Sequence, residues 1–246
     1  MAPSSPNAEI KDITFTCDGL ELVATLHLPA AKRPPVVIGC HGLFSDRNSP
    51  KQSALARECN RHNLAFLRID HRGCGDSQGE FNAVTSLESR CRDLLQAIET
   101  MKARSDIGDG IGLFGSSMGG AVCLALAAEM SPGPIVTVAA PVRSRQIKAA
   151  AESQQAPYSG GPQFDVKKKS FDISPRLSGI SNILLFHGEN DTVVPLEHAR
   201  EVFQFAAEPK KLIIQKNGDH RMSEPAHQQE FIREAGLWFR SGLLGQ

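Results

Sequence analysis

The sequence predicts an α/β fold built on a mostly parallel, eight-stranded sheet with helices on both faces. Residues 36–40 and 111–114 are apolar throughout, and residues 64–69 are apolar except for Arg68, as expected for central parallel strands that are buried on both faces. Helical patterns separate these runs, and this alternation favours a parallel sheet with right-handed crossovers. We interpret residues 1–246 as a single domain with an insertion at about residues 141–181.

The fold is expected to begin with a hairpin. Residues 10–17 and 20–28 are predicted as two strands joined by Asp18-Gly19, a dipeptide typical of hairpin turns. The other strands are expected at residues 36–40, 64–69, 111–114, 135–139, 182–186 and 211–215. Helical patterns lie at residues 51–62, 86–103, 121–130, 196–207 and 224–241.

The connection at residues 141–181 is too long for an ordinary link in a parallel sheet. It carries a helical pattern at residues 143–154, a Pro/Gly-rich stretch at residues 157–162 and a lysine run at residues 167–169. We expect a small cap over the carboxyl edge of the sheet, with the lysines on its solvated face.

The composition excludes several classes of function. Lys plus Arg and Asp plus Glu balance at 27 each, so no net charge draws the protein to nucleic acid or an anionic membrane. No segment approaches the roughly 18 apolar residues of a membrane span, and the first ten residues do not resemble a leader, which favours the cytoplasm. Six scattered cysteines without a C-x-x-C pair argue against a disulfide framework and a zinc site. The oligomeric state is not readable from the sequence.

A small-residue turn at residues 115–120 is the first candidate for chemistry. It reads Gly-Ser-Ser-Met-Gly-Gly and lies between a predicted strand and a predicted helix, which is the setting of a nucleophile elbow. Ser117 would occupy the strained apex, with Gly115 and Gly119 allowing close approach of the flanking backbone. A glycine-rich surface turn is the alternative, and Ser116 is the rival serine, although strand alternation points it away from the apex.

Two further loops could supply the partners that a serine nucleophile requires. A serine hydroxyl needs a base within hydrogen-bond reach, and a histidine base needs a carboxylate to fix its tautomer. Asp191 and His220 each follow a predicted strand, and the order serine, acid, histidine is the one found in α/β hydrolases. Glu189 and Asp219 are the alternative acids.

Five motifs in register carry a resemblance to a known family. They are His41-Gly42-Leu43, the loop from Asp70 to Ser77, Gly115–Gly119, His187-Gly188-Glu189-Asn190-Asp191 and Gly218-Asp219-His220. The chain resembles α/β-hydrolase-fold serine hydrolases from about residue 10 to residue 238, and is similar to small cytosolic esterases that include cinnamoyl/feruloyl esterases and monoacylglycerol-lipase-like enzymes.

The resemblance implies a role for each matching residue. Ser117 would be the nucleophile, Asp191 the acid and His220 the base, while the backbone N–H groups of Leu43 and Met118 would form the oxyanion hole. No cofactor and no metal are implied.

Other polar residues near these motifs have structural interpretations. His41 is expected to brace the oxyanion loop rather than to act as a base. Asp70 and His71 are expected to hold the loop at residues 73–77, and His227 to lie solvated in the last helix.

Substrate choice depends on the cap and the pocket walls. Phe44, Tyr158, Phe164 and Phe171 could line an acyl or aromatic site, or could simply seal the cap against the sheet. We expect a carboxylic ester hydrolase acting on small to medium acyl esters, with hydroxycinnamoyl esters as a candidate subclass. The alternatives are a peptidase, thioesterase or acyltransferase of the same fold, and a non-catalytic ligand-binding member.

Overall fold

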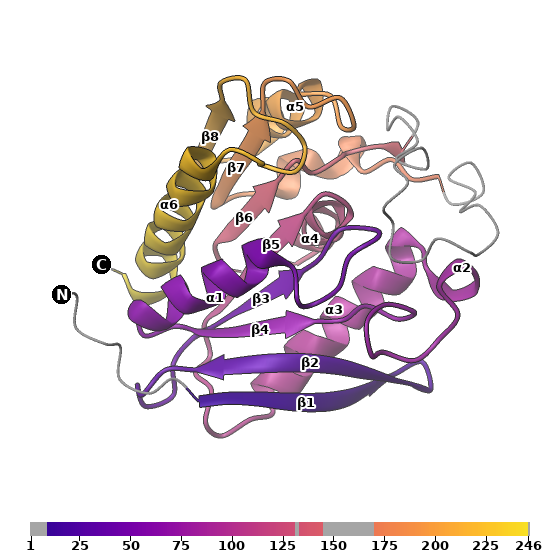
Figure 1. The fold of residues 1–246 in the computed structure, drawn as a ribbon, viewed down its shortest axis with the longest axis vertical. Coiled ribbons are helices and arrows are strands. Elements are labelled where there is room, and N and C mark those ends of the chain that lie inside the picture. Colours follow the sequence, from indigo (N-terminus) through magenta and orange to yellow (C-terminus); the bar gives the residue numbers. More distant parts are fainter. Residues whose placement is uncertain (1–8, 131–132, 145–169, 246) are drawn as a thin grey trace.

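The predicted mostly parallel, eight-stranded sheet is confirmed in the computed structural model, which describes residues 9–130, 133–144 and 170–245. The strand order is β1-β2-β4-β3-β5-β6-β7-β8. β1 and β2 form the antiparallel hairpin, β2 also pairs antiparallel with β4, and every other pair is parallel. The twisted sheet runs through the whole molecule (Figure 1).

The strands agree closely with the sequence prediction. Their bounds are β1 Glu9–Cys17, β2 Leu20–Leu28, β3 Val36–Cys40, β4 Ala65–Ile69, β5 Ile111–Ser116, β6 Ile135–Val138, β7 Ile183–Gly188 and β8 Lys210–Gln215. The helices are α1 Pro50–Arg61, α2 Phe81–Val84, α3 Leu87–Lys102, α4 Met118–Ala127, α5 Glu197–Phe205 and α6 Pro225–Leu244, and Ser174–Gly179 forms a 3₁₀ helix.

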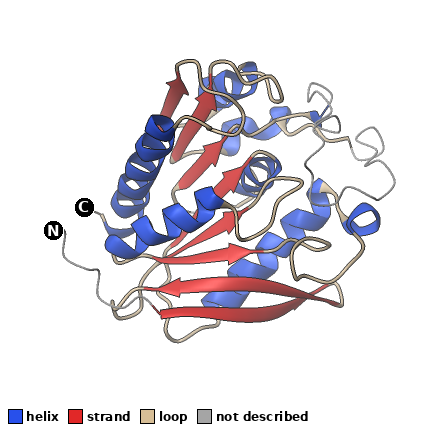
Figure 2. Cartoon of the chain, viewed as in Figure 1, coloured by secondary structure: helices blue, strands red, loops and turns tan. Residues whose placement is uncertain are grey.

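Helices cover both faces of the sheet (Figure 2). α1 and α6 pack on one face, and α3, α4 and α5 pack on the other. Successive side chains of a strand point to opposite faces. In β3, Val37 therefore packs with the first group of helices, whereas Val36 and Ile38 pack with the second. This explains why β3 and β5 carry apolar or small residues on both faces.

Two short helices were not predicted, and one helix was placed too late. α2 and the 3₁₀ helix are too short for a recognisable period of apolar residues. The pattern at residues 121–130 predicted a helix that in fact begins at Met118, because the glycines that follow the elbow are already helical. The start of α3 is fixed by a capping box: the side chain of Ser86 accepts the backbone N–H of Ser89, and the side chain of Ser89 accepts the backbone N–H of Ser86.

Only the two ends of the expected cap lie in the described part of the chain. Arg143 pairs with Asp172 in an isolated antiparallel bridge, so the insertion leaves and returns to the sheet at neighbouring positions. The predicted helix at residues 143–154 and the lysine run lie largely or wholly outside the described residues, and the cap stays a prediction.

All six cysteines are free thiols, five of them buried. Among the helices that the structure describes, none combines the length and apolar character needed to cross a bilayer.

Candidate active site

Ser117 lies between β5 and α4 in a backbone conformation that few residues adopt. Its φ of 53° and ψ of −120° give a non-glycine residue positive φ, a strain of roughly 1–3 kcal/mol. Its N–H donates to the carbonyl of Val138 (2.8 Å), which ties the turn to β6. α4 begins at the next residue, so the positive end of the helix dipole lies beside the serine.

The flanking glycines make this turn possible. A Cβ atom on Gly115 would overlap the backbone of Gly119, and a Cβ atom on Gly119 would overlap the carbonyl of Cys40. The start of α4 thus lies directly against the ends of β5 and β3. Any side chain at either position would force the strand and the helix apart.

The loops that follow β7 and β8 contact each other through their backbones. Asn190 N–H donates to the carbonyl of Gly218 (2.9 Å). A Cβ atom on Gly188 would overlap that same carbonyl, so glycine at this position permits the approach. The two loops carry Asp191 and His220, which are consequently held side by side at the carboxyl edge of the sheet.

The three predicted side chains form a continuous chain of hydrogen bonds. Nδ1 of His220 donates to Oδ2 of Asp191 at 2.7 Å, and the hydroxyl of Ser117 donates to Nε2 of His220 at 3.1 Å. The second carboxylate oxygen of Asp191 accepts the N–H groups of Val193 (2.9 Å) and Val194 (2.8 Å). The Asp191 side chain is fully buried, whereas that of His220 is 20% exposed.

Asp191 is held in its charged form. Burial acts to raise its pKa, but the hydrogen bonds from His220 and from two backbone N–H groups outweigh burial and lower the pKa below its ordinary value. His187 lies on the other side of the carboxylate, with its Nε2 3.4 Å from Oδ2 and 2.8 Å from the carbonyl of Val194. Burial lowers the pKa of His187, so it is neutral there.

The loop after β3 lies against the nucleophile. A Cβ atom on Gly42 would be 3.7 Å from Cβ of Ser117. In residues 9–130, 133–144 and 170–245, no protein group accepts the N–H of Leu43 or of Met118. Two backbone donors are therefore free on either side of Ser117, where developing negative charge on a bound carbonyl would be stabilised.

His41 braces this loop, as the sequence led us to expect. It is buried, its Nδ1 lies 2.7 Å from the carbonyl of Gly42, and its Nε2 accepts the N–H of His71 at 3.1 Å. Burial lowers the pKa of His41 well below its usual range, so the ring is neutral. Since Nε2 is an acceptor, Nδ1 carries the proton and donates to Gly42.

Comparison with known proteins decides the family. A model described as serine aminopeptidase, S33 (Hydrolase_4) matches residues 31–172, more than half of the 246 residues. The chain belongs to the S33 hydrolase family. Its open, mostly parallel sheet is the α/β-hydrolase fold, as predicted. The S33 match covers Ser117 and the loop after β3, while Asp191 and His220 lie beyond it.

The chain is also similar to curated relatives and to solved structures. The uncharacterized protein YfhR of Escherichia coli O157:H7 is 29% identical over 198 residues, which are 78% of this chain and 65% of that protein. This chain thus spans just under two thirds of the relative's length. The esterase domain of a Rhodothermus marinus protein has a TM-score of 0.72 at 24% identity, covering 96% of this chain and 99% of that one. Est1E of Butyrivibrio proteoclasticus, solved with ferulic acid bound, has a TM-score of 0.77 at 20% identity, covering 95% and 100%. These two structures show the shared fold.

The alternative acids are engaged elsewhere in this S33 hydrolase. The carboxylate of Glu189 accepts the N–H of Asn217 at 3.0 Å. Asp219 accepts the N–H (2.8 Å) and the hydroxyl (2.6 Å) of Ser223, as a turn residue does. His227, expected to be solvated, is instead half-buried near the start of α6, because that helix packs against the sheet.

Asp70 holds two loops together, as expected. Its buried carboxylate accepts the N–H groups of Arg47 (2.6 Å) and Asp76 (3.0 Å), and it forms an ion pair with the guanidinium of Arg47. A Cβ atom on Gly75 would overlap this carboxylate, so the glycine-rich loop at residues 73–77 wraps around it.

The predicted pocket aromatics are only partly placed. The ring of Phe44 is half-buried with its centroid 5.5 Å from that of Phe81, which begins α2. Phe171 is half-buried and packs against the hydrophobic core on the face of the sheet that α3, α4 and α5 cover. Tyr158 and Phe164 lie outside the described residues.

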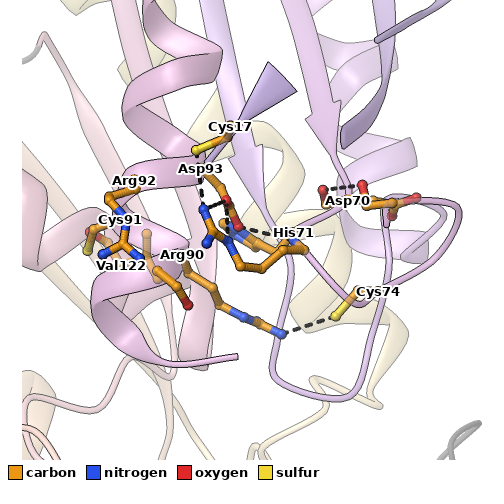
Figure 3. A network of polar contacts seen from close by, with 12 residues as sticks. Cys17, Asp70, His71, Cys74, Arg90, Cys91, Arg92, Asp93 and Val122 are labelled. Carbon is orange, nitrogen blue, oxygen red and sulfur yellow. Dashed lines mark hydrogen bonds and ion pairs between the residues drawn. The ribbon is translucent and has the colours of Figure 1, made fainter. Parts of the chain in front are cut away.

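Two charged residues of α3 that sequence reasoning did not single out, Arg90 and Asp93, belong to a buried network of polar contacts (Figure 3). Arg90 and Asp93 have no solvent-exposed surface. The signal was available in the helix period: Leu87, Arg90 and Leu94 are spaced by three and four residues, so Arg90 lies on the apolar stripe. A charge at such a position indicates a buried polar contact.

Proposed function

We propose that this protein is a serine carboxylic ester hydrolase with Ser117 as nucleophile, His220 as general base and Asp191 as the acid that orients it. The hydrogen-bonded chain from Asp191 through His220 to the strained serine carries this proposal. The S33 family and the esterase fold support hydrolase chemistry in general.

In the first half of the reaction, Ser117 Oγ attacks the ester carbonyl carbon while Nε2 of His220 takes the hydroxyl proton. The carbonyl oxygen becomes an oxyanion and accepts the N–H groups of Leu43 and Met118. The ionised carboxylate of Asp191 stabilises the imidazolium. The carbon–oxygen bond to the alcohol then breaks, and His220 returns its proton to the departing oxygen.

In the second half, a water molecule replaces the alcohol. His220 takes a proton from this water as it attacks the acyl carbon, and the same N–H groups of Leu43 and Met118 hold the second oxyanion. Collapse breaks the bond to Ser117 Oγ, which recovers its proton from His220. The carboxylic acid leaves, and every step uses groups of this chain.

For the substrate, we propose small to medium acyl esters, with hydroxycinnamoyl esters among them. The half-buried ring of Phe44 beside Phe81 offers an aromatic wall near the oxyanion loop. The ferulic acid bound to Est1E is a chemical precedent for such a ligand on this fold. We also propose that the protein acts without a metal or organic cofactor and without stable insertion in a membrane.

Fluorophosphonate labelling tests the nucleophile. We expect stoichiometric labelling of the wild-type protein and none of Ser117→Ala, together with a fall in ester turnover of at least about 10³-fold. Ser116→Ala is the matched control and should label fully. Equal labelling of wild type and Ser117→Ala would contradict the proposal.

A substrate panel then tests the bond preference. p-Nitrophenyl acetate and butyrate, methyl ferulate, an aminoacyl p-nitroanilide and an acyl-coenzyme A thioester would be compared by kcat/KM. We expect the esters to be cleaved fastest. Faster cleavage of the anilide would assign a peptidase, and faster cleavage of the thioester would assign a thioesterase.

A further inference from the structure

Arg90 makes its contacts with the loop that carries the proposed oxyanion donor. Its Nη1 donates to the carbonyl of Gly42 (3.3 Å), and its Nη2 donates to the carbonyl of Leu43 (3.0 Å). Nη2 also lies 3.2 Å from Sγ of Cys74 (Figure 3). The planar guanidinium thus spans two consecutive carbonyl groups, a geometry that a lysine ammonium does not reproduce.

This guanidinium is a buried cation without an anionic partner among the described residues. Arg90 has no exposed surface, and no carboxylate of the residues that the structure describes lies within 4 Å of its guanidinium nitrogens. Asp93, the buried carboxylate of α3, is bound instead by Arg72 (2.7 Å) and by His71 (3.3 Å). Burial raises the pKa of Cys74, so this thiol does not balance the charge.

The carbonyl that Arg90 binds belongs to the same peptide unit as the N–H of Leu43. In a trans peptide the C=O and N–H bonds point in opposite directions. Arg90 and His41 both donate to the Gly42 oxygen and so fix the plane of this peptide. A cationic donor on the oxygen also polarises the peptide and strengthens the N–H as a donor.

We infer that Arg90 is a positioning residue for ester hydrolysis, which orients and polarises the Gly42–Leu43 peptide so that its N–H stabilises the oxyanion. The inference rests on the proposed function. Negative charge on the oxyanion forms on the opposite side of this peptide from the uncompensated cation. Arg90 therefore contributes more in the transition state than in the substrate complex.

Substitution of Arg90 tests the inference through the split between kcat and KM. Arg90→Met removes the charge and the donors, and Arg90→Lys keeps the charge without the fork. With active sites counted by fluorophosphonate titration, we expect kcat per site on p-nitrophenyl butyrate to fall about 10–100-fold in Arg90→Met, with KM within about two-fold. Removal of a whole oxyanion donor costs about 10²–10³-fold, which sets the upper limit. Arg90→Lys should fall between Arg90→Met and wild type.

Arg68→Met is the matched control. Arg68 is also buried and donates to a carbonyl of the same connection, that of Arg47 (2.6 Å), but at its far end. We expect this variant to lose thermal stability while its kcat per site stays within about two-fold of wild type. An unchanged kcat in both Arg90 variants, or an equal fall in Arg68→Met, would overturn the inference. If Arg90→Met does not fold, the inference is tested by comparing kcat per site in Arg90→Lys with kcat per site in Arg68→Met.

A measurement that needs no turnover separates this inference from the proposed function. Labelling with carbonyl-¹³C glycine and ¹⁵N leucine gives NMR signals only for the five Gly-Leu peptides of the chain. We expect the Gly42–Leu43 signal to move most in Arg90→Lys and to stay in place in Arg68→Met. An unmoved signal overturns the positioning role. A moved signal in a protein that hydrolyses no ester would instead contradict the proposed function and, with it, the catalytic part of the inference.

Discussion

At the scale of single residues, Asp191 and Glu189 are two carboxylates of one loop with different surroundings. Asp191 is fully buried against His220, whereas Glu189 is exposed and accepts a backbone N–H. Asp191→Asn removes the charge that stabilises the imidazolium and leaves the wrong tautomer of His220. We expect kcat to fall on the order of 10³–10⁴-fold, measured on p-nitrophenyl butyrate.

Glu189→Gln keeps an oxygen that can accept from Asn217 and should retain activity within about two-fold. Asp219→Asn should behave in the same way. Loss of activity in Glu189→Gln with retention in Asp191→Asn would exchange the assignments of the two carboxylates.

The residues of the proposed site differ in how far the sequence predicts them. Ser117 is marked by a local string, and Asp191 and His220 by their positions after strands that end at one edge. Arg90 is not marked by any motif, because its role depends on a contact with Gly42 across 48 positions of the chain. The predicted pocket residues Tyr158 and Phe164 stay untested.

At the scale of elements, the elbow is a three-way contact between β3, β5 and α4. Gly119→Ala would drive a Cβ into the carbonyl of Cys40, and backbone cannot move aside as a side chain can. We expect destabilisation at or above the upper end of about 1–3 kcal/mol, measured by urea unfolding. Gly42→Ala is the control, since its Cβ would meet only ordinary contacts at 3.7 Å. Equal stability of the two variants would contradict this reading of the elbow.

α3 contributes a second element-scale test through Asp93. Its carboxylate accepts the backbone N–H (3.1 Å) and the Nε–H (2.8 Å) of Arg72 and contacts His71 at 3.3 Å, and the side chains of Asp93 and His71 have no exposed surface. Asp93→Asn removes the buried anion of the Arg72 guanidinium and leaves only its ion pair with the partly exposed Asp18 (2.9 Å). We expect a loss of about 3–5 kcal/mol in the free energy of unfolding.

The control for Asp93 is an ion pair on the surface. Arg61 pairs with Glu58 at 2.6 Å but its side chain is 62% exposed. Arg61→Ala should change the free energy of unfolding by less than about 1 kcal/mol. A loss in Asp93→Asn no larger than that in Arg61→Ala would show that the buried network is not stabilising.

The bounds of strands and helices were predicted correctly where the sequence pattern and its turn residues define them, and incorrectly where tertiary contacts define them. β2 and β3 have the predicted bounds because prolines and turn residues delimit them. The start of α4 was misplaced because its first turn is glycine-rich, and low helix propensity is overridden there by packing against β3 and β5. α2 is held by its N-cap, Glu80, which accepts two backbone N–H groups, and so needs no apolar period.

At the scale of the whole molecule, buried neutral histidines make stability depend on pH. Burial lowers the pKa of four histidines: His27, His41, His187 and His198. His71 differs: burial acts to lower its pKa, but its interactions with Asp93 and Cys40 together outweigh burial and raise the pKa. A histidine that stays neutral in the fold but takes a proton when unfolded opposes folding in acid.

His27 allows this effect to be isolated. It joins β2 to β4 by accepting Nε–H of Arg68 at 2.9 Å, and burial lowers its pKa to about 4. Its contribution is complete above the unfolded pKa of about 6.5 and is lost as pH falls from there toward 4. His27→Gln keeps an acceptor but cannot titrate. We therefore expect the free energy of unfolding, measured in urea, to fall less steeply from pH 7 to pH 5 in His27→Gln than in wild type. The difference between the two slopes should correspond to the uptake of less than one proton on unfolding. Because the other histidines titrate alike in both proteins, they cancel in this difference, and parallel pH profiles would show that His27 is protonated equally in the folded and unfolded states.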